Sequence, residues 1–141
     1  MNLKFAAVAA VAAILTAGAA QAEIIHFSAT LSGADEVPAN SSQGKGVLSA
    51  ELETAEHTLA FRVSYSGLSG PATMAHFHGP AAPGANAPPT IAVSDPSSPI
   101  GGAALLTPAQ AADLLAGKWY FNVHSQANPG GEIRGQLKRE N

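Results

Sequence analysis

Hydrophobic and polar residues alternate along most of the chain from Glu23 onward. In residues 25–31, for example, isoleucine, phenylalanine, alanine and leucine are separated by histidine, serine and threonine. Side chains on a β-strand point alternately to opposite faces, so this pattern predicts half-buried strands. The predicted strands are residues 25–31, 48–52, 59–65, 73–78, 91–93, 119–124 and 133–137.

Two pairs of these strands are predicted hairpins, because short turn segments join 48–52 to 59–65 and 119–124 to 133–137. Between them, residues 79–89 are rich in glycine, proline and alanine, which predicts a long loop. About seven to eight short strands with one short helix in a connection predict an all-β domain. The expected architecture is an antiparallel β-sandwich or a flattened barrel.

The single predicted helix covers residues 109–116. Thr107 can serve as its N-cap, Pro108 suits the first helical position, and Gln110 completes a capping box. Gly117 suits the left-handed conformation that often ends a helix.

The first 22 residues have the features of a secretory signal peptide. Lys4 supplies a positive charge, residues 5–20 are apolar, and Ala20-Gln21-Ala22 matches a small-residue cleavage site. The apolar run is short for a membrane-spanning helix, and the alternative is an uncleaved N-terminal anchor. Cleavage would leave one domain, residues 23–141, secreted or in the periplasm and without a membrane span.

Without Lys4, the chain has six basic and ten acidic residues and a net charge of −4. This mild acidity argues against nucleic acid and against an anionic membrane surface as partners. The sequence has no cysteine, so the exported chain would have no disulfide. A domain of this size can be stable from burial of its hydrophobic core alone.

Three of the five histidines lie where predicted strands meet Pro- and Gly-rich turns. His76 and His78 are two apart on one strand and share a face, and His124 ends another strand. Neutral imidazole is a preferred ligand of zinc and copper, so these three are candidate ligands of one Cu or Zn ion. We expect them on the solvent side of the sheet, where they meet only if their strands are close or the 79–89 loop folds over them.

A structural role for the same imidazoles is the alternative. They could bond to backbone carbonyls or turn amides and hold the loops at Gly79-Pro80 and at residues 128–131. A His-x-His pair with a third histidine on another strand fits both interpretations, and both stay open here.

Glu132 and Arg134 are two apart on the last predicted strand, opposite the strand that bears His124. Glu132 could accept a hydrogen bond from a histidine N–H, and Arg134 could contact an anion. A simple cross-strand polar pair is the alternative. The adjacent carboxylates Asp35 and Glu36 are predicted to lie in a solvated turn. The sequence contains no motif of a serine hydrolase, phosphate-binding loop, zinc protease or dinucleotide-binding domain.

The chain resembles the CHRD (chordin) domain family over most of residues 23–141. The matching segments, in family order, are Phe27–Pro38, Tyr65–Gly70, Ala75–Ala81, Leu115–His124 and Asn128–Leu137. The resemblance implies an extracytoplasmic β-sandwich-like module, found alone in bacteria and repeated in the animal extracellular protein that gives the family its name. It implies no known reaction.

A looser likeness is to copper–zinc superoxide dismutase, a β-sandwich with a His-x-His strand and a later Val-His ligand. His76, His78 and Val123-His124 are similar to these elements. Residues 79–95 contain no histidine, and the chain has no disulfide. The likeness therefore implies at most a mononuclear three-histidine site.

Together these observations predict an extracytoplasmic binding module with a candidate metal site, and they favour a binding role over an enzymatic one. The predicted partner is an extracellular or cell-envelope protein or ligand. One alternative is a mononuclear copper or zinc enzyme with dismutase-like or hydrolytic activity. Another is a structural cell-envelope or adhesion module whose histidines only hold loops.

Overall fold

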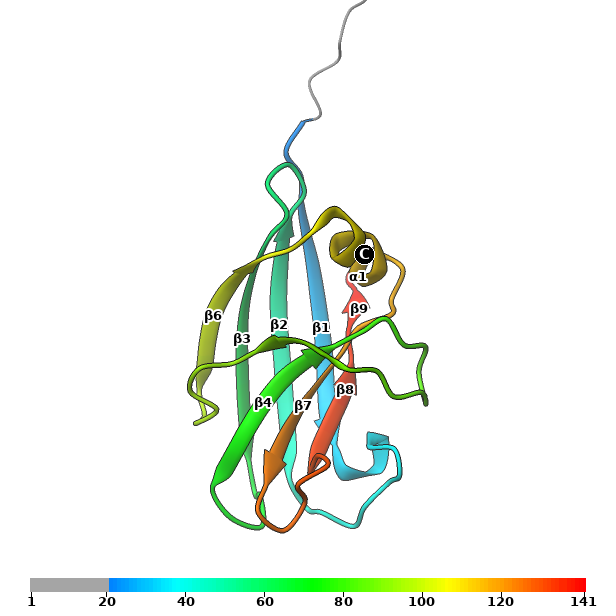
Figure 1. The fold of residues 1–141 in the computed structure, drawn as a ribbon. Coiled ribbons are helices and arrows are strands. Elements are labelled where there is room, and N and C mark those ends of the chain that lie inside the picture. Colours follow the sequence, from blue (N-terminus) through cyan, green and yellow to red (C-terminus); the bar gives the residue numbers. More distant parts are fainter. Residues whose placement is uncertain (1–20) are drawn as a thin grey trace, which may run out of the picture.

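The computed structural model describes residues 21–141, whose arrangement is shown in Figure 1. This part of the chain contains nine strands, one 3-10 helix and one α-helix. The elements are β1 (Ile24–Ser32), η1 (Gly33–Asp35), β2 (Lys45–Glu53), β3 (Thr58–Ser66), β4 (Ala72–His78), β5 (Pro89–Ala92), β6 (Ile100–Leu105), α1 (Pro108–Leu115), β7 (Tyr120–Ser125), β8 (Ile133–Gln136) and β9 (Lys138–Arg139).

The strands form one antiparallel sheet in the order β5-β4-β7-β8-β1-β2-β3-β6, with β9 paired to β1. The sheet folds over itself, so that β4, β7 and β8 lie in front of β1, β2, β3 and β6 (Figure 1). The predicted all-β class is confirmed, and so is the short helix in a connection. Both predicted hairpins, β2–β3 and β7–β8, are also present.

The hydrophobic side chains of the alternating pattern fill the space between the two layers. Along β1, every second residue from Ile25 to Leu31 is buried, and β2 repeats the pattern. Phe77 on β4 packs edge-on against Phe61 on β3 and Phe121 on β7, with ring centroids 4.9 and 4.8 Å apart. Burying an aromatic side chain of this kind contributes roughly 1.5–3 kcal/mol. This cluster joins the front and back layers.

The helix α1 begins as its capping residues predict. The Thr107 hydroxyl accepts a hydrogen bond from the Gln110 backbone N–H at 3.1 Å, and Gln110 Oε1 accepts one from the Thr107 N–H at 2.9 Å. Gly117 follows the helix with φ of 72°. Leu114 is buried and anchors the helix to the core.

Two strands and the 3-10 helix were not expected from the alternation pattern. The strand β6 contains Gly101 and Gly102 and few large hydrophobic residues, and it pairs along β3 at the edge of the sheet. Its strand conformation comes from that pairing and from Gly102, which leaves room for the Phe61 ring. The two exposed residues of β9 have no hydrophobic pattern to reveal them.

The predicted signal peptide falls almost wholly on residues 1–20, outside the described residues, and stays a prediction. Between residues 21 and 141, the structure contains no helix with the length and apolar character needed to cross a membrane.

Candidate metal centre

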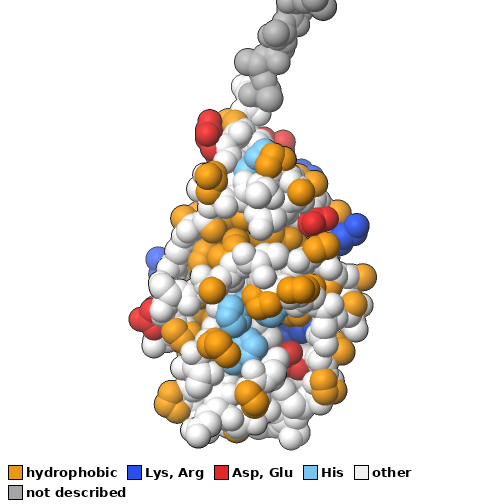
Figure 2. Space-filling view, viewed as in Figure 1, with side chains coloured by type: hydrophobic (Ala, Val, Ile, Leu, Met, Phe, Trp, Pro, Cys, Tyr) orange, Lys and Arg blue, Asp and Glu red, His pale blue; other side chains and the backbone are white. Residues whose placement is uncertain are grey.

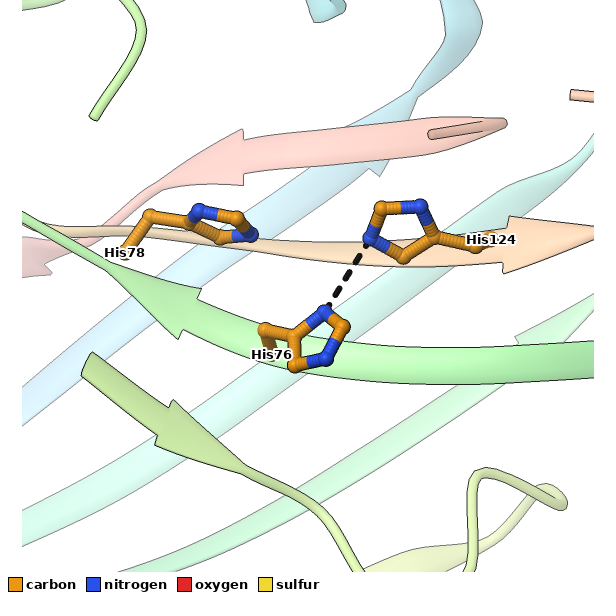
Figure 3. A group of neighbouring side chains, drawn as sticks. All are labelled: His76, His78 and His124. Atoms are coloured by element: carbon orange, nitrogen blue, oxygen red, sulfur yellow. Dashed lines mark hydrogen bonds between the residues drawn. The ribbon is translucent and has the colours of Figure 1, made fainter. Parts of the chain in front are cut away.

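The three candidate histidines come from two neighbouring strands. β4 and β7 pair antiparallel, with His76 opposite Asn122. Because alternate residues of a strand share a face, His76 and His78 of β4 lie on the same side of the sheet as Asn122 and His124 of β7. Figure 3 shows the three imidazoles gathered across these strands.

The three imidazoles are close enough to share one ion. One ring nitrogen from each histidine lies within 4.8 Å of those from the other two. The shortest separation, 3.2 Å, joins His76 Nδ1 to His124 Nε2 (Figure 3). Zinc–nitrogen bonds of about 2.0–2.1 Å place two ligands of a tetrahedral ion roughly 3.3 Å apart. The histidines predicted from the sequence therefore form a compact cluster that needs only small side-chain adjustments to hold an ion.

Backbone carbonyls orient two of the rings. The His78 Nδ1–H donates to the Ala87 carbonyl at 2.9 Å, and the His124 Nδ1–H donates to the Pro129 carbonyl at 2.8 Å. A carbonyl oxygen can only accept, so each bond fixes the ring proton on Nδ1. In a neutral ring, the lone pair is then on Nε2. These bonds also tie the strands to two loops, as the structural alternative expects.

Both Nε2 atoms face the side-chain oxygen of Asn122. Asn122 Oδ1 lies 2.8 Å from His78 Nε2 and 3.0 Å from His124 Nε2. Asn122 is not among the site residues predicted from the sequence. Its one signal in the sequence is its position two residues before His124, on the same face of the predicted strand.

The burial of Glu36 corrects the prediction of a solvated turn at this position. Glu36 is 6 % exposed and approaches Asn122 from the loop after β1. Burial raises its pKa to about 7, with the Asn122 amide and the Arg134 guanidinium partly offsetting that effect. Its atom Oε1 has no hydrogen-bond partner among the described residues.

Burial also favours the neutral form of His76 and His78. It lowers the pKa of His78 and of His76, and the neighbouring imidazoles add to the lowering at His76. Neutral imidazole is the form that binds metal ions. The environment therefore favours the ligand form of these two rings.

The histidines lie on the outer face of the front layer, as expected, and the loop of residues 79–89 lies against this site. His78 and His124 are each only 6 % exposed, and every residue of β7 is buried. The ring of Tyr120 stacks on His78 with centroids 4.6 Å apart, and the Arg134 guanidinium lies 3.5 Å above Tyr120. This stack supports the loop of residues 79–89.

Arg134 binds the covering loop directly. Its guanidinium donates to the Ala85 carbonyl at 2.7 Å and to Asn86 Oδ1 at 2.9 Å. Its side chain is buried, and its hydrogen bonds go to the chain itself. The structure thus places Arg134 beside the cluster, where it fastens the loop, and its suggested contact with an anion stays a prediction.

Glu132 belongs to a different group of polar side chains. Its carboxylate accepts hydrogen bonds from the hydroxyls of Ser42 and Ser69, at 2.7 and 2.8 Å, and from the Ser69 N–H at 2.7 Å. These bonds, together with the Ser125 hydroxyl, outweigh burial and hold the pKa of Glu132 at about 2. The structure does not bring Glu132 to a histidine N–H, since the carbonyls of Ala87 and Pro129 accept those protons.

The cluster opens to solvent on one side. Histidine side chains lie together on one face of the molecule, bordered by apolar side chains (Figure 2). His76 is only partly buried, whereas His78 and His124 are buried. An ion held here would be reached from the His76 side.

The comparison with known families agrees with this architecture. The CHRD domain matches residues 27–137, which is most of the chain. The chain belongs to the CHRD domain family. The resemblance seen in the sequence is thereby confirmed. Searches of curated proteins and of solved structures found no match to this CHRD domain.

Proposed function

We propose that this CHRD domain is an extracytoplasmic binding module that holds one copper or zinc ion through His76, His78 and His124. One observation carries the proposal: His76 Nδ1 lies 3.2 Å from His124 Nε2 inside a cluster whose ligand nitrogens fall within 4.8 Å of each other. Side chains from separate strands are thus already near the spacing that a four-coordinate ion requires.

The orientation of the rings supports a metal role in addition to loop attachment. Metal-binding histidines usually donate their second ring N–H to a carbonyl or carboxylate, which fixes the tautomer and strengthens the ligand nitrogen. His78 and His124 both do so, toward Ala87 and Pro129. The remaining ring nitrogen, Nε2, of both histidines then faces the interior of the cluster.

The extracytoplasmic location is supported by the leader-like pattern of residues 1–22 and by membership of the CHRD family. In the proposed role, the fold presents the ion at the partly open side of His76 to an extracellular or cell-envelope partner. The covering loop leaves that side as the approach to the site.

Metal content is the test of this proposal. Residues 23–141 are purified without a tag, exposed to Zn(II) or Cu(II), dialysed, and measured by elemental analysis. We expect one ion per chain in the parent and none in the His76→Ala, His78→Ala double variant. The control is His26→Ala, because His26 is exposed on β1 and lies near the new amino terminus, where copper can bind adventitiously.

Two results would overturn the proposal. One is a parent chain that keeps no zinc or copper after dialysis. The other is a double variant that retains the ion while His26→Ala releases it. If the double variant instead loses thermal stability and the parent holds no ion, the histidines serve only to hold the loops.

The half-open side at His76 also favours the enzymatic alternative as a second candidate, since a substrate could reach an ion there. Superoxide dismutation and ester hydrolysis are measured on the loaded parent against the same concentration of free ion. Activity that exceeds the free ion and disappears in the double variant would establish a mononuclear enzyme. If the loaded parent is no faster than the same concentration of free ion, the result would support the binding role.

A further inference from the structure

The side chain of Asn122 lies where an additional ligand of the cluster would be. Its Oδ1 is 2.8 Å from His78 Nε2 and 3.0 Å from His124 Nε2. These separations are close to those between ligands bound to one ion of about 2.0–2.2 Å bond length. Asn122 is 2 % exposed, so water does not compete for this oxygen from outside.

The ring N–H groups of His78 and His124 do not point at Asn122 Oδ1, so they donate no hydrogen bond to it. The N–H groups of His78 and His124 are both committed to backbone carbonyls at Nδ1. In neutral rings, their Nε2 atoms offer lone pairs, and an amide oxygen also offers only lone pairs. His124 Nε2 can accept a hydrogen bond from His76 Nδ1, 3.2 Å away, but no hydrogen lies between His78 Nε2 and Asn122 Oδ1. Acceptors brought together in a buried site cost free energy unless a cation joins them.

The orientation of the Asn122 amide follows from its other neighbour. The amide nitrogen of Asn122 and Oε1 of Glu36 both lie against Gly131, at the place where a Cβ on that glycine would be. Glu36 Oε1 makes no hydrogen bond among the described residues, but an ionised carboxylate attracts an amide N–H and repels an amide oxygen. Glu36 therefore favours the orientation in which the nitrogen faces it and the oxygen faces the histidines.

From this geometry we infer that Asn122 Oδ1 is the fourth ligand of the metal site, with Glu36 as the residue that positions it. The inference rests on the proposed function and specifies its donor set as three imidazole nitrogens and one amide oxygen. An amide oxygen is a harder ligand than a thiolate or thioether. The set therefore suits divalent copper or zinc better than Cu(I).

The first test compares Cu(II) affinity in chain 23–141 and its variants by competition with a chelator. In Asn122→Leu, which keeps the branched shape and removes the oxygen, we expect at least about a tenfold loss of affinity. Asn122→Asp keeps an oxygen ligand and should bind Cu(II) at least as tightly as the parent. Glu36→Gln can donate to the Asn122 oxygen and turn the amide, so a loss of about 10- to 100-fold is expected.

The second test leaves the residues of the site unchanged. The parent is prepared with asparagine labelled with carbon-13 at the side-chain carbonyl, loaded with one equivalent of Cu(II), and examined by pulsed electron paramagnetic resonance. A carbonyl bound to copper gives a strong carbon-13 coupling. The exposed His26→Ala variant, labelled in the same way, should give the same signal.

The outcomes separate this inference from the proposed function. Strong carbon-13 coupling, with weaker binding in Asn122→Leu and retained binding in Asn122→Asp, would support Asn122 as a ligand. Full Cu(II) binding through imidazoles without carbon-13 coupling would overturn the inference and leave the three-histidine site intact. A parent that binds neither Cu(II) nor Zn(II) would overturn both.

Discussion

Each of the two buried histidines divides its nitrogens between a loop and the cluster. His78 holds Ala87 and His124 holds Pro129 through Nδ1, and both keep Nε2 for the interior of the site. The structural and metal-binding interpretations of these residues thus use different atoms of the same ring. A histidine can serve both roles, as metal sites usually require.

Glu132 shows how a single side chain can hold several loops together. Its two carboxylate oxygens accept bonds from Ser42 and from the hydroxyl and N–H of Ser69, joining the loops before β2 and before β4 to the start of β8. Hydrogen bonds to a buried charge are worth roughly 1.5–3 kcal/mol each. Glu132 is therefore expected to matter for folding rather than for metal binding.

The Glu132→Gln substitution tests this role through the pH dependence of stability. The pKa of Glu132 is about 2 in the folded protein, against an ordinary value of 4.5. Its ionised form therefore stabilises the fold fully above pH 4.5, and this contribution is lost as pH falls toward 2. Urea unfolding should show the parent losing stability across that range, and Glu132→Gln losing less.

At neutral pH, Glu132→Gln should lower the free energy of unfolding by about 2–3 kcal/mol. The matched control is Glu56→Gln, an exposed residue in the turn between β2 and β3, which should change stability by less than about 0.5 kcal/mol. If both variants gave the same pH profile as the parent, the serine-bound carboxylate would have no stabilising role.

At the scale of elements, the strands of the core could be predicted because one face of each is buried. The alternation along β1, β2 and β3 follows the layers closely, and the capping residues set the start of α1. The strand β6 could not be found in this way, since Gly101 and Gly102 bury little and depend on β3 for their conformation. Pairing of this kind is a property of the fold and not of the local sequence.

The candidate site, too, could be predicted only in part, because strand pairing is not visible in the local sequence. The spacing of His76 and His78 placed both on one face, but only the pairing of β4 with β7 brings Asn122 into the cluster. Glu36 precedes Val37-Pro38 in a polar loop, and its buried carboxylate lies against Gly131, far away in the sequence. Period-two patterns report one strand at a time, whereas a site depends on which strands are neighbours.

The covering loop begins at a close contact that can be tested by substitution. Gly79 packs against the indole ring of Trp119, and a Cβ at this position would overlap that ring and lie 2.8 Å from the Lys118 carbonyl. Gly79→Ala should therefore lower stability by about 1–3 kcal/mol through overpacking, as measured by thermal or urea unfolding. Gly101→Ala is the control, because a Cβ there meets nothing within 4 Å. Equal effects of the two substitutions would contradict the tight packing of the loop.

Arg134 fastens the middle of this loop, and Arg134→Met removes the hydrogen bonds while roughly keeping the volume. The carbonyl of Ala85 and the side chain of Asn86 then lose their donors. We expect faster hydrogen exchange of amides in residues 84–88 and a loss of about 2–3 kcal/mol in the free energy of unfolding. Arg62→Met, exposed on β3, should leave exchange in this loop unchanged. Unaltered exchange in Arg134→Met would mean that the loop is held by other contacts.

At the scale of the whole molecule, the two layers of one folded sheet carry a polar cluster on the outside of the front layer. The hydrophobic core lies between the layers and contains Phe27, Phe77 and Phe121. Substitutions in the histidine cluster therefore need not disturb the core. In this domain the candidate site and the hydrophobic framework are therefore separate parts of the structure.

The most direct measurement is a crystal structure of residues 23–141 with Cu(II) or Zn(II), using the anomalous scattering of the metal. We expect one strong anomalous peak about 2.0–2.1 Å from a ring nitrogen of each of His76, His78 and His124. A peak bound at other residues, or no peak while the three imidazoles keep their present hydrogen bonds, would contradict the account.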